Sequence, residues 1–159
     1  MTEIRLLPGL PLMHTPADPA EEAWLLIAEV SALRTGRWMT TAAELGLTAV
    51  QARALVAVDP HTPAPMGVLG SALCIDRASL TELVDHLEHR GYLERRASPQ
   101  DRRVKVLAVT SAGATARERL IGALTTPDAT LGRLSAEQLD TIATALRRVL
   151  AESVPMTES

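Results

Sequence analysis

The stretch that decides the fold runs from residue 65 to residue 110 and reads PMGVLGSALCIDRASLTELVDHLEHRGYLERRASPQDRRVKVLAVT. Its residues 76–90 place apolar side chains at the i, i+3, i+4 and i+7 positions of one helix face, at Leu80, Leu83, Val84 and Leu87. Gly91 is a typical helix stop. A shorter apolar segment over residues 66–73 precedes this helix. The pattern predicts two helices joined by a tight turn.

A basic β-hairpin is predicted directly after the second helix. Residues 92–96 and 104–109 alternate as strands do, and a Ser-Pro-Gln-Asp turn separates them. Residues 92–105 carry five Arg or Lys against two acidic residues, although the whole chain has a net charge of −3. A nucleic acid responds to the charge of the surface that it contacts rather than to the net charge of the whole chain. The basic hairpin therefore favours a DNA-binding role over an ordinary α+β fold whose charged side chains are only solvated.

Asp101-Arg102-Arg103, followed by Val106-Leu107-Ala108-Val109-Thr110 and Gly113, is similar to the wing signature of the MarR family of winged helix-turn-helix transcriptional regulators. Residues 80–93, LTELVDHLEHRGYL, resemble the recognition helix of that family and its exit. The resemblance covers about residues 47–120. It implies a mainly α (α+β) fold, with a winged helix-turn-helix over residues 47–109 and dimerisation helices over 19–46 and 110–153.

The resemblance assigns roles to the wing. Arg103 is expected to enter the minor groove, where a narrow groove concentrates negative potential, and Asp101 to orient it. The alternative is an exposed ion pair of little energetic value. The remaining basic residues of the hairpin are expected to contact phosphates or to be solvated: Arg95, Arg96, Arg102 and Lys105.

Six residues of the second helix are candidates to face DNA. Four of them can reach bases or phosphates: Arg77, Ala78, Ser79 and Thr81. Glu82 and His86 depart from the family, in which basic residues are frequent at both positions. A carboxylate accepts a hydrogen bond from cytosine but is repelled by phosphates. The two changes therefore predict weaker or more salt-sensitive binding, or an altered target sequence.

The flanking segments complete a chain of 159 residues, which suits a single domain over residues 1–159. Residues 1–18 hold three prolines and are expected to form an extended N-terminal arm. Apolar stripes at 24–38 and 139–150 fit either an intramolecular core or, as the resemblance implies, a two-fold dimer interface. A homodimer places two recognition helices about 34–36 Å apart, on a pseudo-palindromic double-stranded operator.

The resemblance also implies a ligand-responsive regulator, most often a repressor. Its relatives bind small, often aromatic or anionic effectors between the dimerisation helices and the winged unit. Four residues are candidates to line such a cleft, although ordinary core or surface roles stay open for them: Trp38, Met39, Arg53 and His61. The rival hypothesis is a winged-helix docking module without DNA binding, which Glu82 and the acidic total favour and Asp101 and Arg103 oppose.

Other chemistry finds little support in the sequence. Cys74, in the turn between the two helices, is expected to be a small buried residue rather than a redox sensor. His86 and His89 are spaced to share a metal but lack a further ligand at metal-site spacing, so no metal and no cofactor is expected. No nucleophile–base pair, phosphate loop or HExxH motif is present in the sequence, which predicts a protein that is not an enzyme.

The composition bears on location. A single Cys excludes an internal disulfide and fits a reducing compartment. The sequence has no apolar run long enough to span a membrane and no basic-then-apolar N-terminus typical of a signal peptide. We therefore expect a cytoplasmic protein with no membrane partner.

Overall fold

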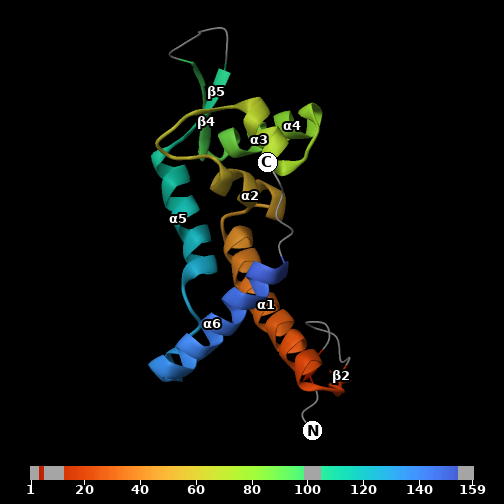
Figure 1. Ribbon diagram of the computed structural model, residues 1–159. Coiled ribbons are helices and arrows are strands. Elements are labelled where there is room, and N and C mark those ends of the chain that lie inside the picture. Colours follow the sequence, from red (N-terminus) through yellow and green to blue (C-terminus); the bar gives the residue numbers. More distant parts are fainter. Residues whose placement is uncertain (1–3, 6–12, 99–104, 154–159) are drawn as a thin grey trace. The chain divides into compact units, whose positions relative to one another are not determined.

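The computed structural model describes residues 4–5, 13–98 and 105–153 (Figure 1). The described helices are α1 (Pro19–Glu44), α2 (Ala49–Ala57), α3 (Met66–Leu73), α4 (Arg77–His89), α5 (Ser111–Thr125) and α6 (Ala136–Ser153), with a 3-10 turn η1 (Leu131–Arg133) before the last. The strands are β1 (Ile4–Arg5), β2 (Met13–His14), β3 (Ala64–Pro65), β4 (Leu93–Ala97) and β5 (Lys105–Val109). The chain forms two compact units, Met1–Thr125 and Thr126–Ser159.

Local capping sets the ends of the first two helices. Asp18 caps α1, and its carboxylate accepts hydrogen bonds from the backbone N–H groups of Ala20 and Glu21. The chain leaves α1 through Gly46, at a φ of +64°. Thr48 and Gln51 then form a capping box that starts α2.

The predicted helix-turn-helix is confirmed, with α3 and α4 meeting at a three-residue turn. Asp76 caps α4 through hydrogen bonds from the N–H groups of Ala78 and Ser79. The start of α3 is weaker, because Pro65 provides no side-chain cap. Buried Leu69 and Gly70 hold this short helix by packing, and Leu80 of α4 lies against Gly70.

The wing is a three-stranded antiparallel sheet in the order β3-β5-β4. Arg95 pairs with Leu107 and Arg96 with Val106, so the predicted hairpin is present, with strands one residue from the expected bounds. Ala64 and Pro65 add the third strand, β3, and pair with Leu107 and Val106. Proline lacks an N–H donor, and β3 is an edge strand, where that lack is tolerated.

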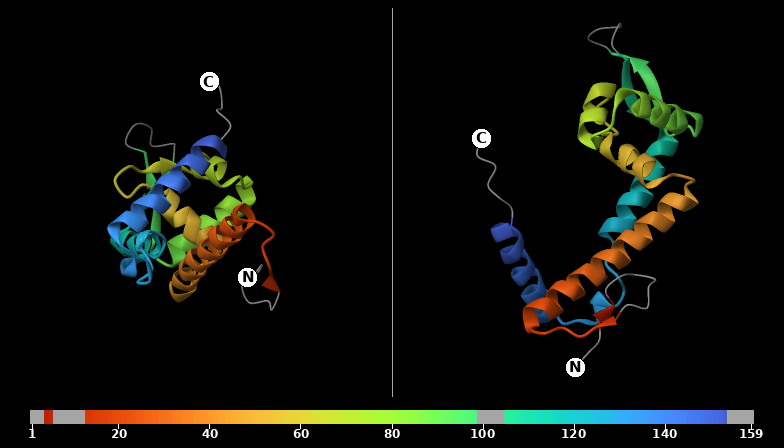
Figure 2. Two further views of the ribbon diagram at one scale, coloured as in Figure 1. Left: turned by 60° about the horizontal axis from the view of Figure 1, so that its bottom comes forward. Right: turned by 90° about the vertical axis from the view of Figure 1, so that its right-hand side faces the viewer.

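An aliphatic core joins the helices of the first unit to the sheet. Its largest fully buried side chains come from α2, α4, the two wing strands and α5: Leu55, Val58, Val84, Leu87, Leu93, Leu107 and Leu120. In Figures 1 and 2, α1 and α5 run beside each other beneath the group formed by α2, α3 and α4. Gly113 permits the approach of α5 to the sheet, because a Cβ there would lie 1.9 Å from the carbonyl oxygen of Tyr92.

The two ends of the chain add short elements. The N-terminal arm is not one extended segment, since β1 and β2 pair antiparallel, with Ile4 opposite His14 and Arg5 opposite Met13. In the second unit, Ser135 and Gln138 form the predicted capping box before α6. None of the helices in the described part of the chain has the length and apolar character needed to cross a bilayer.

Candidate nucleic-acid interface

The recognition-helix candidate α4 has a buried side and an open side. Leu80, Leu83, Val84 and Leu87 are buried, as the helical spacing predicts. The side opposite them presents Ala78, Glu82, Asp85 and His89, all exposed. The other helix candidates flank this line: Arg77, Ser79 and Thr81 are exposed and His86 is half-buried. The structure therefore leaves every helix candidate accessible to a macromolecular partner.

The first turn of α4 is tied down by its own N-cap. The hydroxyl of Ser79 donates to Asp76 Oδ2 over 2.6 Å, and the backbone N–H of Ser79 donates to Asp76 Oδ1. These hydrogen bonds from Ser79, together with one from the N–H of Ala78, lower the pKa of the Asp76 carboxyl. Because the Ser79 hydroxyl already donates its hydrogen bond to Asp76, it can act toward DNA only as an acceptor.

Arg95 holds the wing against α4. Its guanidinium lies 2.7 Å from Asp85 Oδ1 and also pairs with Glu88, whose other oxygen accepts a hydrogen bond from the Arg95 backbone N–H. The Arg95 side chain is 26% exposed, so this charge is largely enclosed and neutralised. Sequence reasoning expected Arg95 to contact phosphates and did not single out Glu88. The only hint was the i, i+3 spacing of Asp85 and Glu88 next to a basic strand.

The other basic residues of the hairpin are more open. Arg96 pairs with Glu94 on the same strand, and both side chains are substantially exposed. Lys105 is exposed at the start of β5. Asp101, Arg102 and Arg103 lie outside the described residues, so the roles expected for them stay predictions.

A second arginine, which sequence reasoning did not single out, joins α4 to α1. Arg90 follows α4, and its guanidinium donates to the carbonyl oxygen of Leu45 over 2.9 Å and to His86 Nε2 over 3.2 Å. The guanidinium lies directly over Gly46, where a Cβ would come within 2.1 Å of Arg90 Nη1. Arg90 thus ties the C-terminal end of the recognition-helix candidate to the end of α1, whereas Asp76 caps the helix's own first turn.

Hollows flank α4 on both sides. One, of about 690 Å³, lies toward α3 and the wing and is lined by residues that include Met66, Arg77, Thr81 and Arg95. The other, of about 240 Å³, lies toward the start of α2 and is lined by residues that include Gln51, Ser79, Glu82 and His86. The open side of α4 is therefore bordered by hollows on both sides, an arrangement that suits a helix that enters the major groove.

Residues 47–105, from the start of α2 to the wing, match the model of the MarR family. Over these residues the chain is similar to the MarR family. It is also similar to the HTH-type transcriptional repressor NicR of Pseudomonas putida, with 27% identity over 141 residues that cover 88% of this chain and 89% of NicR. The similarity to NicR therefore extends over most of both chains.

Solved structures agree on the fold. The YusO protein of Bacillus subtilis has a TM-score of 0.69 at 19% identity, covering 88% of this chain and 100% of that one. The S. aureus MepR–DNA complex has a TM-score of 0.68 at 19% identity, covering 80% and 96%. At such low identity these matches show the fold, which is the winged helix-turn-helix arrangement predicted from the sequence.

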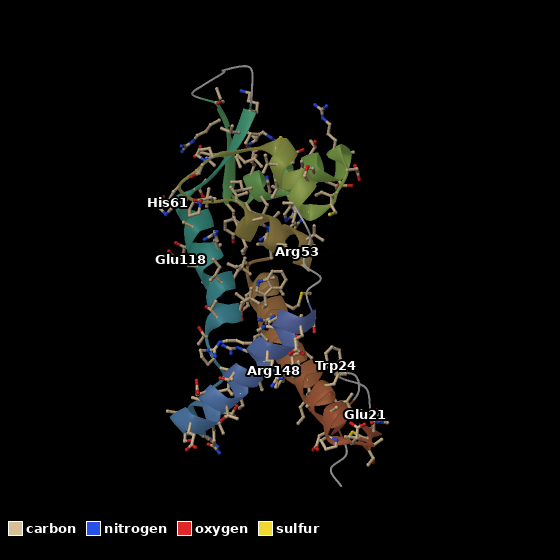
Figure 3. The ribbon with its side chains drawn as sticks, in the orientation of Figure 1. Glu21, Trp24, Arg53, His61, Glu118 and Arg148 are labelled. Atoms are coloured by element: carbon tan, nitrogen blue, oxygen red, sulfur yellow. The ribbon has the colours of Figure 1, made fainter. Side chains whose placement is uncertain are left out.

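The four effector candidates are dispersed over the structure. Trp38 is buried in the hydrophobic core, with 8% of its surface exposed, and its indole Nε1–H has no hydrogen-bond partner within the described residues. Met39 is 44% exposed on α1. Arg53 on α2 and His61 in the following loop are exposed and lie well apart (Figure 3). The hollows beside α4 are lined by other residues.

The expectation of a buried Cys74 is wrong. Cys74 is exposed, and it adopts a left-handed conformation (φ 54°, ψ 42°) at the C-cap of α3. The position closes the helix and reverses the chain, so its side chain lies on the outside of the turn rather than under it. Among the described residues no cluster of three potential metal ligands occurs, and His86 Nε2 is engaged by Arg90.

Proposed function

We propose that this protein is a sequence-specific DNA-binding transcriptional regulator that acts as a homodimer on a pseudo-palindromic operator. The carrying observation is the open side of α4, which Arg95 ties to the basic wing and Arg90 ties to the end of α1. Rigid presentation matters because base contacts require a fixed register on the duplex. MarR-family proteins are regulators of transcription, and NicR is named a repressor, so repression is the proposed mode.

The dimer rests on apolar side chains that remain at the surface. On α1, Trp24 is 67% exposed, Val30 60% and Leu33 66%. On α6, Ile142 is 43% exposed and Leu150 63%. Large apolar side chains that stay this exposed on helices are typical of surfaces that bind another protein. A second copy of the chain is the occupant we propose, since it also supplies the second recognition helix that a palindrome needs.

The proposed effector is a small aromatic or anionic compound that carries a hydrogen-bond acceptor. Its support is the indole of Trp38, because a buried donor without a partner costs about 1–3 kcal/mol, which an accepting carbonyl or carboxylate would recover. Met39 lies next to Trp38 in sequence and is exposed. Titration of aromatic carboxylates against the fluorescence of a Trp24→Phe variant, which retains Trp38 alone, tests this part of the proposal.

One observation favours the rival docking module. Glu82 and Asp85 lie on the outermost line of α4, and the charges of Arg95 and Arg96 are paired with carboxylates. Such a surface meets phosphates less favourably than an unpaired basic one. The docking module therefore predicts no retained binding to any duplex, whereas the regulator predicts binding that depends on sequence.

The discriminating experiment is fluorescence anisotropy with a duplex from the promoter of the protein's own gene and a scrambled duplex of equal length. The regulator is expected to bind the promoter duplex at least about a hundredfold more tightly than the scrambled one. Ratios of specific to non-specific affinity are typically about 10³–10⁷. Absent binding to both duplexes favours the docking module, and equal binding to both contradicts sequence-specific recognition. For the regulator we propose the cytoplasm as location, in keeping with the single, unpaired Cys74.

A further inference from the structure

The carboxylates of α4 differ in what they contact. Asp76 accepts hydrogen bonds from the first turn, and Asp85 and Glu88 pair with Arg95. Glu82 is exposed and has no hydrogen bond or ion pair to any described residue. Asp76, Asp85 and Glu88 therefore stabilise the protein's own structure, whereas Glu82 makes no such contact.

Glu82 also lies on the open side of α4, within its N-terminal half. It lies opposite the buried stripe, in line with Ala78, Asp85 and His89, and shares a shallow hollow with Ser79 and His86. In helix-turn-helix proteins the N-terminal part of the recognition helix reaches the base edges. Glu82 is the sixth residue of α4 and so belongs to this part.

Base chemistry narrows what an unpaired carboxylate there can accept. In the major groove, guanine presents only acceptors, and thymine an acceptor and a methyl group. Adenine offers its N6 amino group beside the N7 acceptor, whose lone pair repels a carboxylate. Cytosine offers its N4 amino group without an acceptor on the same base edge. Cytosine is therefore the base that compensates the charge of Glu82.

We propose that Glu82 is a specificity-determining residue that accepts a hydrogen bond from N4 of a cytosine in each half-site. The inference rests on the proposed function and adds to it the identity of one base. The competing account is that Glu82 only repels phosphates and lowers affinity for all DNA alike. The two accounts predict different patterns over base positions.

The test begins with selection from a random duplex library by the full-length protein, followed by single-base variants of the selected operator. Dissociation constants are measured by anisotropy for the parent, Glu82→Ala and Glu82→Gln. Glu118→Gln serves as the matched control, because it removes the same charge from an exposed position on α5, away from α4 (Figure 3). Circular dichroism verifies that each variant is folded.

The parent is expected to prefer cytosine at one symmetric position by about tenfold per half-site. Glu82→Ala reduces that preference to within about twofold and leaves the other positions unchanged. Glu82→Gln shifts it toward adenine, because Gln pairs with both N6 and N7. Glu118→Gln keeps the parental pattern.

Two outcomes overturn the inference. If Glu82→Ala raises affinity for every duplex by the same factor, or keeps the parental cytosine preference, Glu82 does not read a base, although the proposed function stands. If the parent selects no sequence from the library, the proposed function fails and the inference fails with it.

Discussion

Arg95 and Lys105 stand on adjacent strands of the wing, and their charges meet different surroundings. The guanidinium of Arg95 contacts the carboxylates of Asp85 and Glu88, whereas Lys105 is exposed. A paired, largely enclosed arginine positions the strand that carries it, while an exposed lysine remains available to a phosphate. Arg95 therefore has a structural role, whereas Lys105 is available for binding DNA.

Arg103→Ala is expected to weaken operator binding by between about tenfold and several-thousandfold, while dimerisation and circular dichroism stay unchanged. A base-directed contact is worth roughly 1–3 kcal/mol, and a two-fold dimer loses it twice. Asp101→Ala should cause a smaller loss of the same kind, since Asp101 is expected only to orient the arginine.

Lys105→Ala is the comparison for that measurement. A phosphate contact carries no sequence information, so its loss weakens binding to all duplexes alike and flattens the salt dependence. If Arg103→Ala also weakens scrambled and operator duplexes equally, Arg103 is a phosphate contact and the role implied by the wing signature is wrong.

Cys74→Gly is expected to stabilise the protein by up to about 1.5 kcal/mol. The left-handed conformation of Cys74 costs a residue with a Cβ roughly 1–2 kcal/mol, and the greater freedom of glycine in the unfolded chain takes back about 0.5–1 kcal/mol. Urea unfolding measures the difference. Cys74→Ala keeps the Cβ and should show no such gain; equal stability of the two variants would mean that the turn is not strained.

At the scale of elements, α4 is tied to the rest of the first unit by two arginines. Arg95 of the wing pairs with carboxylates on its side, and Arg90 at its C-terminal end donates to the carbonyl oxygen of Leu45. Asp76 caps the first turn of the helix itself. Tyr92 adds a hydrogen bond to the Leu45 carbonyl oxygen over 3.4 Å. Because Leu45 is the C-cap residue of α1, these hydrogen bonds link the end of α1 to the end of α4.

Asp76→Ala is expected to destabilise the protein at neutral pH, and the difference from the parent should disappear in acid. The pKa of the Asp76 carboxyl is lowered from its ordinary value of 3.8 by its hydrogen bonds to Ser79. A carboxyl whose pKa is lowered in the folded state stabilises the protein at pH values above its pKa in the unfolded state. This stabilisation is lost as the pH falls through the pKa of the folded state. Urea unfolding between pH 2 and pH 6 should show this convergence only below about pH 4; a constant difference would exclude the ionised cap.

Gly46→Ala is expected to destabilise the protein by about 2–4 kcal/mol. The φ of +64° is unfavourable for alanine, and the new Cβ displaces the guanidinium of Arg90 from the Leu45 carbonyl. Gly67→Ala is the control, because a Cβ at Gly67 meets no atom within 4 Å and alanine is the better helix former. Thermal unfolding should therefore give opposite signs; the same sign for both would contradict the role of Gly46.

At the scale of the whole molecule, the apolar residues of α6 require an explanation. Leu139, Leu146 and Val149 are 38%, 37% and 46% exposed, and α6 has no buried residue. An isolated amphipathic helix with such a stripe gains stability mainly from packing against another surface. Dimerisation supplies that surface in the proposed function.

Leu146→Glu is expected to dissociate the dimer or to unfold the protein, and in either case to abolish operator binding. The reason is that the new carboxylate would be buried in the proposed dimer interface without a partner of opposite charge. Thr144→Glu adds the same charge to the opposite side of α6 and should preserve the dimer. Light scattering at micromolar concentration measures both. A parent protein that is monomeric under these conditions would contradict the dimer itself.

The sequence by itself determined the features that depend on neighbours a few residues apart. The bounds of α3, the buried stripe of α4, the capping boxes at Thr48 and Ser135, and the strands of the wing all agree with their patterns. Each depends on a period of 3.6 or 2 residues or on hydrogen bonds spanning three residues, so the necessary information lies within one short segment. The open side of α4 was predictable for the same reason.

Only the tertiary structure decided which charges on that side are paired and what holds the helix in place. Arg90 and Leu45 are 45 residues apart, and β3 meets β5 across more than 40, so no local period records either contact. The pairing of Arg95 with Asp85 and Glu88 and the exposure of Cys74 likewise follow from how the elements pack. A side chain's type determines which partners it can bind, whereas the packing of distant segments determines which partners are within reach.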